Sequence, residues 1–297
     1  MVILGQADFE GYVCSTLENE SLKIWITREV GPRVIGLSLM GGDSLLAVLP
    51  DAKIVLEGSQ DFSLRGGHRL WYAPENPETT YIADDHPVEI SEIEDGVELE
   101  QVVDLKTGIQ KSWKVILDDR KAMLRIVHKL TNQGEHLFML APWAITQLKP
   151  GGTAVLPLQL DRADEYGLLP NRQIVFWPYT KLNSPYLHLN DKSIIVEANI
   201  SQGALKVGAP NPIGWLAYEL GGYLFVKEAE YQAGSHYLDR GASSQIYCDP
   251  GVIELETLGP AVELAPGESV EHEETWRIYP EGSWPEEISQ FYISSDR

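Results

Sequence analysis

Cysteine and long apolar runs are the scarcest features of this sequence. The 297 residues include two cysteines, Cys14 and Cys248, which lie far apart. This is not the dense cysteine pattern of a disulfide-stapled secreted domain, so we expect two reduced thiols. Residues Met1 to Asp8 contain neither a basic segment nor a sustained apolar run. No apolar run elsewhere in the sequence approaches membrane-spanning length. The expectation is a cytoplasmic protein without a membrane partner.

Basic residues are also few compared with acidic ones. The chain has 23 Lys and Arg against 44 Asp and Glu, which gives a formal charge of −21. A field of this sign repels phosphate backbones and anionic lipid surfaces, so nucleic acid is excluded as an expected partner. A neutral sugar tolerates the field, whereas a sugar phosphate requires a local basic pocket.

Several motifs of cofactor-dependent enzymes are missing. The sequence has no phosphate-binding loop, dinucleotide fingerprint or Gly-x-Ser-x-Gly elbow, which argues against kinases, dehydrogenases and α/β-hydrolases. The spacing of His128, His136, His188 and His272 matches no familiar metal-ligand pattern, and two distant cysteines make no zinc site. The sequence predicts neither a metal nor another cofactor.

The sequence does contain recurrent period-two alternation. Within Ile109 to Leu117 the apolar residues fall on one face, interrupted by Lys111, and the pattern repeats at Leu124, Ile126 and Leu130 after Asp118-Asp119-Arg120, which predicts a β-hairpin. Helical periodicity is scarce, and its best example is Pro285 to Phe291 with Ser283 as a possible N-cap. Many short strands predict an all-β sandwich or barrel. No linker divides the chain, so we expect one domain over residues 1–297.

The segment from Leu64 to Glu75 is the first candidate for a binding site. Gly66 and Gly67 permit a bend or a close approach, and the residues after them suit a polyhydroxylated ring. An indole can stack on the apolar face of a sugar, while charged groups bond its hydroxyls. The candidates are His68, Arg69, Trp71 and Glu75. The structural alternative is a glycine-marked bulge before a strand with a buried tryptophan.

Two further segments carry candidate polar groups. In a strand, Glu254 and Glu256 point to one face about 7 Å apart, and burial would raise a carboxyl pKa toward the range of a general base. The alternative is a solvated acidic strand face. Further side chains that could form hydrogen bonds with a sugar lie between residues 205 and 241. The alternative is that the lysines among them are solvated, as most strand lysines are. These candidates are Lys206, Lys227, His236, Asp239 and Arg240.

Short motifs along most of the chain resemble those of the galactose mutarotase-like, or aldose 1-epimerase-like, family. The similarity begins at Leu17 to Ile24 and Gly31 to Leu37, and continues at Thr131 to Gly134 with Ala141 to Thr146. It ends at Glu254 to Pro260 followed by Leu264 to Glu268. The order and spacing of these motifs over the whole length carry the resemblance.

This resemblance implies a β-supersandwich of two large antiparallel sheets with a sugar site on one of them. In the epimerase branch a glutamate removes the anomeric proton and a histidine protonates the ring oxygen. Leu255-Glu256-Thr257 matches the glutamate motif, so the resemblance implies that Glu256 is the base. Trp143 stands where the family has the histidine that acts as general acid. We include Trp143 among the predicted sugar-binding residues. His68 and His236 are the substitute acids.

Three functions follow from these residues. The first is an aldose 1-epimerase-like isomerase, and the second is a carbohydrate-binding or accessory protein that has lost the acid. The third is an epimerase of phosphorylated hexoses, which is disfavoured by the acidic charge. Its phosphate ligands would be drawn from Arg65, Arg69, Lys206, Lys227 and Arg240.

Overall fold

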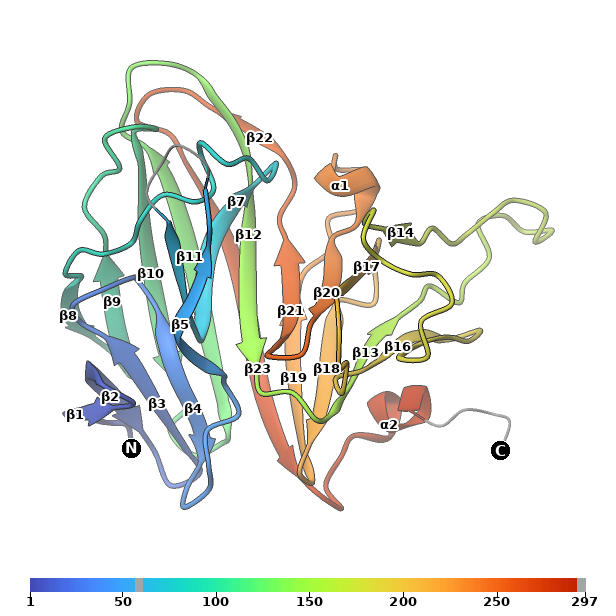
Figure 1. Cartoon of the computed structure of the whole chain (residues 1–297), viewed down its shortest axis with the longest axis horizontal. Helices are drawn as coiled ribbons and strands as arrows, with labels where there is room; N and C mark the ends of the chain where they lie inside the picture. Colours follow the sequence, from blue (N-terminus) through green and yellow to red (C-terminus); the bar gives the residue numbers. More distant parts are fainter. Residues whose placement is uncertain (57–60, 293–297) are drawn as a thin grey trace.

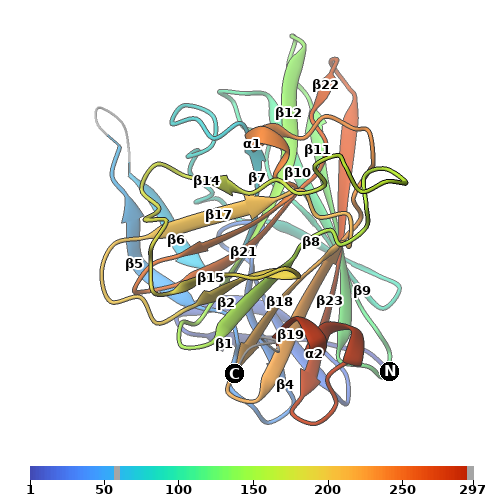
Figure 2. The ribbon, with the colours of Figure 1, turned by 90° about the vertical axis from the view of Figure 1, so that its right-hand side faces the viewer.

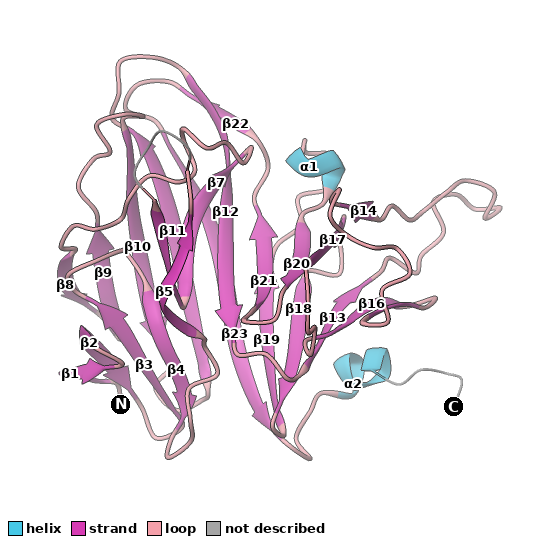
Figure 3. Ribbon diagram, viewed as in Figure 1, coloured by secondary structure: helices cyan, strands magenta, loops and turns pink. Residues whose placement is uncertain are grey.

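The computed structural model describes residues 1–56 and 61–292, and almost all regular structure in this part of the chain is β-strand (Figure 1). Figure 3 shows the strands in magenta and the helices in cyan, and the described residues contain two short helices. Two large sheets contain most of the strands, and every strand pair is antiparallel. The predicted all-β sandwich of two large antiparallel sheets is therefore confirmed.

The first sheet has eleven strands and will be called the site sheet. Its order is β1 (Ile3–Phe9), β2 (Tyr12–Glu18), β3 (Leu22–Thr27), β4 (Val34–Leu39), β7 (His68–Ala73), β12 (Phe138–Leu148), β21 (Ile253–Leu258), β20 (Ser244–Cys248), β17 (Leu205–Ala209) and β14 (Val175–Phe176), with β22 (Val262–Leu264) paired to β12. Strand β12, from the middle of the chain, thus lies between β7 and β21, which are far from it in sequence.

The second sheet has ten strands and will be called the back sheet. Its order is β15 (Leu187–Leu189), β16 (Ser193–Glu197), β13 (Thr153–Pro157), β18 (Trp215–Leu220), β19 (Tyr223–Ala229), β23 (Ser269–Pro280), β11 (Met123–Asn132), β10 (Ile109–Leu117), β9 (Gly96–Glu100) and β8 (Glu89–Ile93). A separate hairpin joins β5 (Val48–Ile54) to β6 (Phe62–Gly66). Figure 2 shows the strands of the two sheets from the side.

The hairpin of β10 and β11 illustrates how alternation produces the sandwich. Its register pairs Leu117 with Leu124, as the acidic turn between the two runs predicts. The Asp118 carboxylate closes the turn by accepting backbone N–H bonds from Arg120 and Lys121 at 2.9 and 2.8 Å. Every second side chain then faces the other sheet, so Trp113 lies in the core with 1% exposure. Since the two sheets share one continuous core, we infer a single domain.

Gly66 and Gly67 form the bend between β6 and β7 with φ values of 88° and 71°. A Cβ atom on Gly66 would lie 2.1 Å from the carbonyl oxygen of Ala47, and one on Gly67 would lie 2.3 Å from that of Val34. Only glycine fits such contacts at positive φ. The bend sets which residues of β7 face away from the core.

The two helices lie outside the sheets. Helix α2 (Glu286–Tyr292) overlaps the predicted helical segment and buries Ile288 against Leu224 and Val226, on the outer face of the back sheet. The single turn α1 (Leu238–Gly241) has left-handed φ values at Asp239 and Arg240. Neither of these helices is long and apolar enough to cross a membrane, among the residues described. Cys14 and Cys248 are both buried and free.

Candidate functional site

A cleft of about 350 Å³ lies on the face of the site sheet that points away from the back sheet. Strand alternation explains its position, because Leu70, Ile253 and Leu255 point into the core while their neighbours point outward. The cleft is lined by Ile54, Leu64, Arg69, Trp71, Glu75, Tyr81, Trp143, Gln147, Tyr179, Ala204, Lys206, Tyr247, Asp249, Val252 and Glu254. Six of the twelve predicted site residues are among them.

The strand register brings together four of these six residues, Trp71, Trp143, Lys206 and Glu254. Lys206 pairs with Tyr247, Tyr247 with Glu254, and Glu254 with Gln147, so one row of side chains crosses β17, β20, β21 and β12. A second row joins Trp143 to Trp71 across β12 and β7. Arg69 and Glu254, 185 positions apart in sequence, thus share one cleft.

The two glutamates of β21 point to the same face of the strand but differ in how accessible their carboxylates are from the cleft. Glu254 lines the cleft, and its Oε1 accepts bonds from Arg69 Nη2 at 3.2 Å and from Gln147 Nε2 at 2.7 Å. Glu256 is 0% exposed and lies beneath Lys206 and Trp143, both of which bond its Oε2. Burial raises the pKa of Glu256 to about 7 against the opposing pull of Lys206. The predicted base is therefore covered, and Glu254, although 8% exposed, is the more accessible carboxylate of the pair.

Lys206 occupies an aromatic and acidic environment. Its Nζ lies 2.8 Å from Glu256 Oε2 and 4.7 Å from the ring centroids of both Trp143 and Trp177. Indole faces and a carboxylate both stabilise an ammonium group. The side chain therefore presents a positive charge at the floor of the cleft.

Aromatic rings form one wall of the cleft. Trp71 and Trp143 make an edge contact at 5.4 Å, and Tyr81 contacts Trp71 at 5.3 Å. The Arg69 guanidinium stacks on Trp71 at 4.1 Å, and its Nε and Nη1 are buried without a hydrogen-bond partner among the described residues. Gln147 Oε1 is also buried and unbonded there. Rings beside unsatisfied polar groups suit a ligand that is apolar on its faces and polar at its edges.

His68 and Lys227 do not reach the cleft, although both were predicted site residues. His68 lies two residues before Leu70 in β7, so its side chain is on the same face of the strand. It points between the sheets and is 0% exposed. Lys227 lies on β19 of the back sheet and is also 0% exposed. The strand patterns alone do not reveal which sheet each strand joins, and sheet membership decides which face is the interior.

Between the sheets, these two residues join a hydrogen-bonded polar cluster. His128 Nδ1 donates to the carbonyl of His272 at 2.9 Å, so its Nε2 accepts from His68 Nε2, 2.7 Å away. His68 Nδ1 then accepts from the Thr146 hydroxyl at 3.0 Å. Burial lowers the pKa of His68 and that of His128, so both rings are neutral.

The same cluster contains a buried ion pair. Lys227 Nζ lies 2.9 Å from Glu274 Oε1 and also donates to the carbonyls of Ala144 and Leu255. The ligand atoms of His68, His128 and Glu274 lie within 4.8 Å of one another, which is a possible metal geometry. A divalent cation there would add charge beside a buried ammonium, and hydrogen bonds already account for the arrangement.

The remaining predicted residues lie near the α1 turn and do not line the cleft. His236 and Arg240 are exposed, and Asp239 accepts a bond from Gln245 Nε2 at 2.8 Å. Arg65, a candidate phosphate ligand, instead pairs with Asp84 and Asp85. Of the five candidate phosphate ligands, only Arg69 and Lys206 therefore line the cleft, and both are paired with glutamates.

Some cleft residues were not predicted from the sequence. Gln147 follows Trp143 by four positions and therefore shares its strand face, which was a usable signal. Tyr247 shares a row with Glu254 only because β20 pairs with β21. Tyr81 and Tyr179 come from irregular segments, whose path no periodicity predicts.

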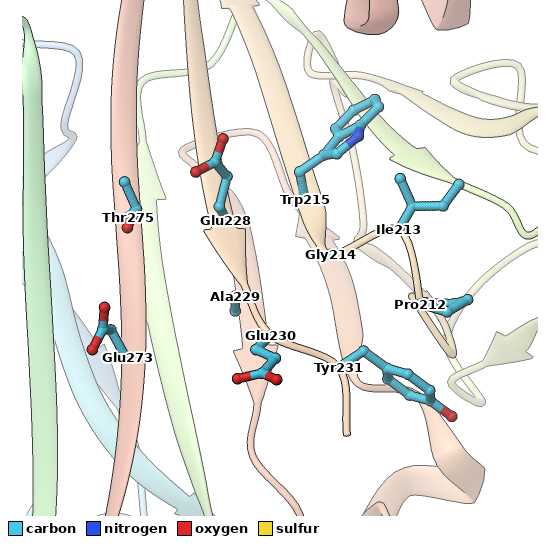
Figure 4. A pocket seen from close by; sticks show the side chains of 10 residues that line it. All are labelled: Pro212, Ile213, Gly214, Trp215, Glu228, Ala229, Glu230, Tyr231, Glu273 and Thr275. Carbon is cyan, nitrogen blue, oxygen red and sulfur yellow. The ribbon is translucent and has the colours of Figure 1, made fainter. Parts of the chain in front are cut away.

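A second hollow of about 580 Å³ lies on the outer face of the back sheet, beside β18, β19 and β23 (Figure 4). Figure 4 shows the carboxylates of Glu228, Glu230 and Glu273 along these elements, with Trp215 and Tyr231 to one side. Glu228 pairs with Arg277 at 3.1 Å. None of the predicted site residues lines this hollow.

Comparison with known proteins identifies the fold. No family model and no curated protein matches the sequence. A structure described as a candidate aldose 1-epimerase from Escherichia coli K12 has a TM-score of 0.53 at 14% identity, covering 89% of this chain and 98% of that one. A galactose mutarotase-like protein from Lactobacillus casei has a TM-score of 0.58 at 12% identity, covering 93% and 100%.

A third similar structure is a TPR-domain containing protein from Parabacteroides distasonis. It has a TM-score of 0.61 at 17% identity, and the match covers 96% of this chain and 50% of that one. At these identities the comparisons concern the fold. The chain has the galactose mutarotase-like fold, which confirms the resemblance found in its sequence motifs.

Proposed function

We propose that the protein binds a neutral saccharide in the cleft of the site sheet. The observation that carries this proposal is the combination of Trp71 and Trp143 with unsatisfied polar atoms of Arg69 and Gln147 in one hollow. Sugars need both features, because their rings have apolar C–H faces and hydroxyl edges. The name of the Lactobacillus casei relative, galactose mutarotase-like, agrees with a sugar ligand.

The charges in the cleft favour a neutral ligand over a phosphorylated one. The two cations, Arg69 and Lys206, pair with Glu254 and Glu256, and the carboxylates of Glu75 and Asp249 add further negative charge. Binding a phosphate group would require cations that are not already paired with carboxylates. A hexose-phosphate epimerase is therefore disfavoured.

Ligand-induced stabilisation tests the proposal. Neutral mono- and disaccharides should raise the melting temperature of the wild type, because a ligand at about 100 times its dissociation constant stabilises the folded state by about 2.7 kcal/mol. Glu254→Gln should weaken this shift, while Glu273→Gln, on the far face of the back sheet, should preserve it. The absence of a shift with every saccharide, or an equal loss in both variants, would contradict the proposal.

A second candidate function is interconversion of sugar anomers, as in an aldose 1-epimerase. The presence of Glu254 and Lys206 in one cleft favours it, because opening a sugar ring needs a proton acceptor and a proton donor within reach of the same substrate. Catalysed exchange between the anomers of an aldose would establish this activity. Exchange at the uncatalysed rate would leave carbohydrate binding as the function.

A further inference from the structure

We propose that Lys206 is the proton donor to the ring oxygen of the sugar, with Glu254 as the facing base. This inference rests on the anomer-interconverting candidate of the proposed function. It assigns the acid to a lysine, since Trp143 occupies the expected position of the histidine and none of the described residues lining the cleft is a histidine.

The other donors that line the cleft are less suitable. Arg69 does not give up its proton under ordinary conditions. Tyr81 already donates to Glu75, and Tyr247 donates to Asp249 at 3.0 Å. Burial and nearby carboxylates raise the pKa of Tyr179, which makes it a weaker acid than an ordinary tyrosine. Lys206 has three N–H donors, and the only hydrogen bond of its Nζ within the described residues uses one of them, so protons remain for a ligand in the cleft.

The positions of Lys206 and Glu254 suit opposite roles on one sugar ring. They lie in the same row, with β20 between their strands, so their backbones are separated by about 10 Å. The only hydrogen bonds that Glu254 accepts within residues 1–56 and 61–292 go to Oε1, which leaves Oε2 for a ligand. Tyr247 stands between them in this row, so a sugar ring lying over Tyr247 would have one of the two groups on each side.

The reaction balances with these two groups. Glu254 takes the proton of the anomeric hydroxyl, the bond from C1 to the ring oxygen breaks as the C1 carbonyl forms, and the ring oxygen takes a proton from the Lys206 ammonium. Rotation about the bond between C1 and C2 exposes the other carbonyl face. The same transfers in reverse close the ring and restore both side chains.

Glu256 supports this role from beneath. It holds the Lys206 Nζ at 2.8 Å, and Trp143 and Trp177 confine the ammonium from two sides. The bond from the ammonium to Glu256 Oε2 fixes the position from which Lys206 gives up a proton. Glu256 is thus a positioning residue, while Lys206 and Glu254 contact the substrate.

Nuclear magnetic resonance measurement of anomer exchange in neutral aldoses tests the assignment. Lys206→Met should lower the catalysed rate by about 100-fold or more, the usual contribution of a general acid. Lys206→Arg should retain saccharide binding but lose the catalysed rate, since a guanidinium keeps its proton. Lys149→Met, at an exposed position just after β12, is the matched control and should behave as wild type.

The outcomes separate this inference from the proposed function. Saccharide binding without catalysis by the wild type would overturn the lysine assignment and leave carbohydrate binding intact. Full catalysis by Lys206→Met or Lys206→Arg would overturn the assignment and leave the epimerase intact. If Lys206→Met fails to fold because Glu256 is left unpaired, the Lys206→Met and Glu256→Gln double variant removes both charges, and full catalysis by it would again overturn the assignment.

Discussion

Glu254 and Glu256 show how much of the site can be predicted from the spacing of residues in one strand. Period-two alternation placed Glu254 and Glu256 on the same face, opposite Ile253 and Leu255, and the structure has this arrangement. Their different access depends on Lys206 and Trp143, which come from other strands. Sequence spacing contains no information about these covering residues, so it could not predict which glutamate faces a ligand.

At the residue scale, Trp143→Phe should raise the pKa of Glu256 above about 7. The indole N–H bonds Glu256 Oε2 at 2.7 Å and favours the ionised form, so its removal favours the protonated form. A bond to a charged group is worth about 1.5–3 kcal/mol, which predicts a rise of about one pH unit or more. Carbon-13 titration of the Glu256 carboxyl measures it.

Trp71→Phe is the matched control for this titration. It makes the same substitution in the same cleft, but Trp71 forms no hydrogen bond with Glu256 among the described residues. The Glu256 pKa should therefore stay near its wild-type value in that variant. Equal pKa values in wild type and Trp143→Phe would show that the indole bond has no influence on Glu256.

At the scale of elements, Lys227 connects the two sheets directly behind the cleft. From β19 it donates to the carbonyl oxygens of Ala144 and Leu255, on the neighbouring strands β12 and β21 of the site sheet. Glu274 on β23 holds the same ammonium at 2.9 Å. Because the residues next to Ala144 and Leu255 face the cleft, this pair fixes the backbone that supports the site.

Lys227→Met should destabilise the protein by about 3–5 kcal/mol, the cost of leaving a buried carboxylate without its partner. Adding Glu274→Gln to this variant should restore part of the loss, because the uncompensated charge is then removed. Urea unfolding of wild type and the two variants measures these free energies. Wild-type stability in Lys227→Met, or no recovery in the double variant, would contradict the role given to the pair.

At the scale of the whole molecule, the sequence predicted the architecture but not the assembly of the site. Local alternation, turns such as the one closed by Asp118, and the order of short motifs were sufficient for a sandwich of two antiparallel sheets. The cleft instead depends on pairings such as β7 with β12 and β17 with β20, between distant parts of the chain. Lys206 and Lys227 have similar strand contexts, yet one faces the cleft and the other the interior.

The most direct test of the proposed saccharide site is a titration followed by the indole N–H signals of the eight tryptophans. A neutral saccharide should shift the signals of Trp71 and Trp143, which line the cleft, and that of Trp177, which contacts Lys206. The signal of Trp215, beside the hollow of the back sheet, should stay unchanged. Shifts confined to Trp215, or no shift with any saccharide tested, would contradict a sugar site in this cleft.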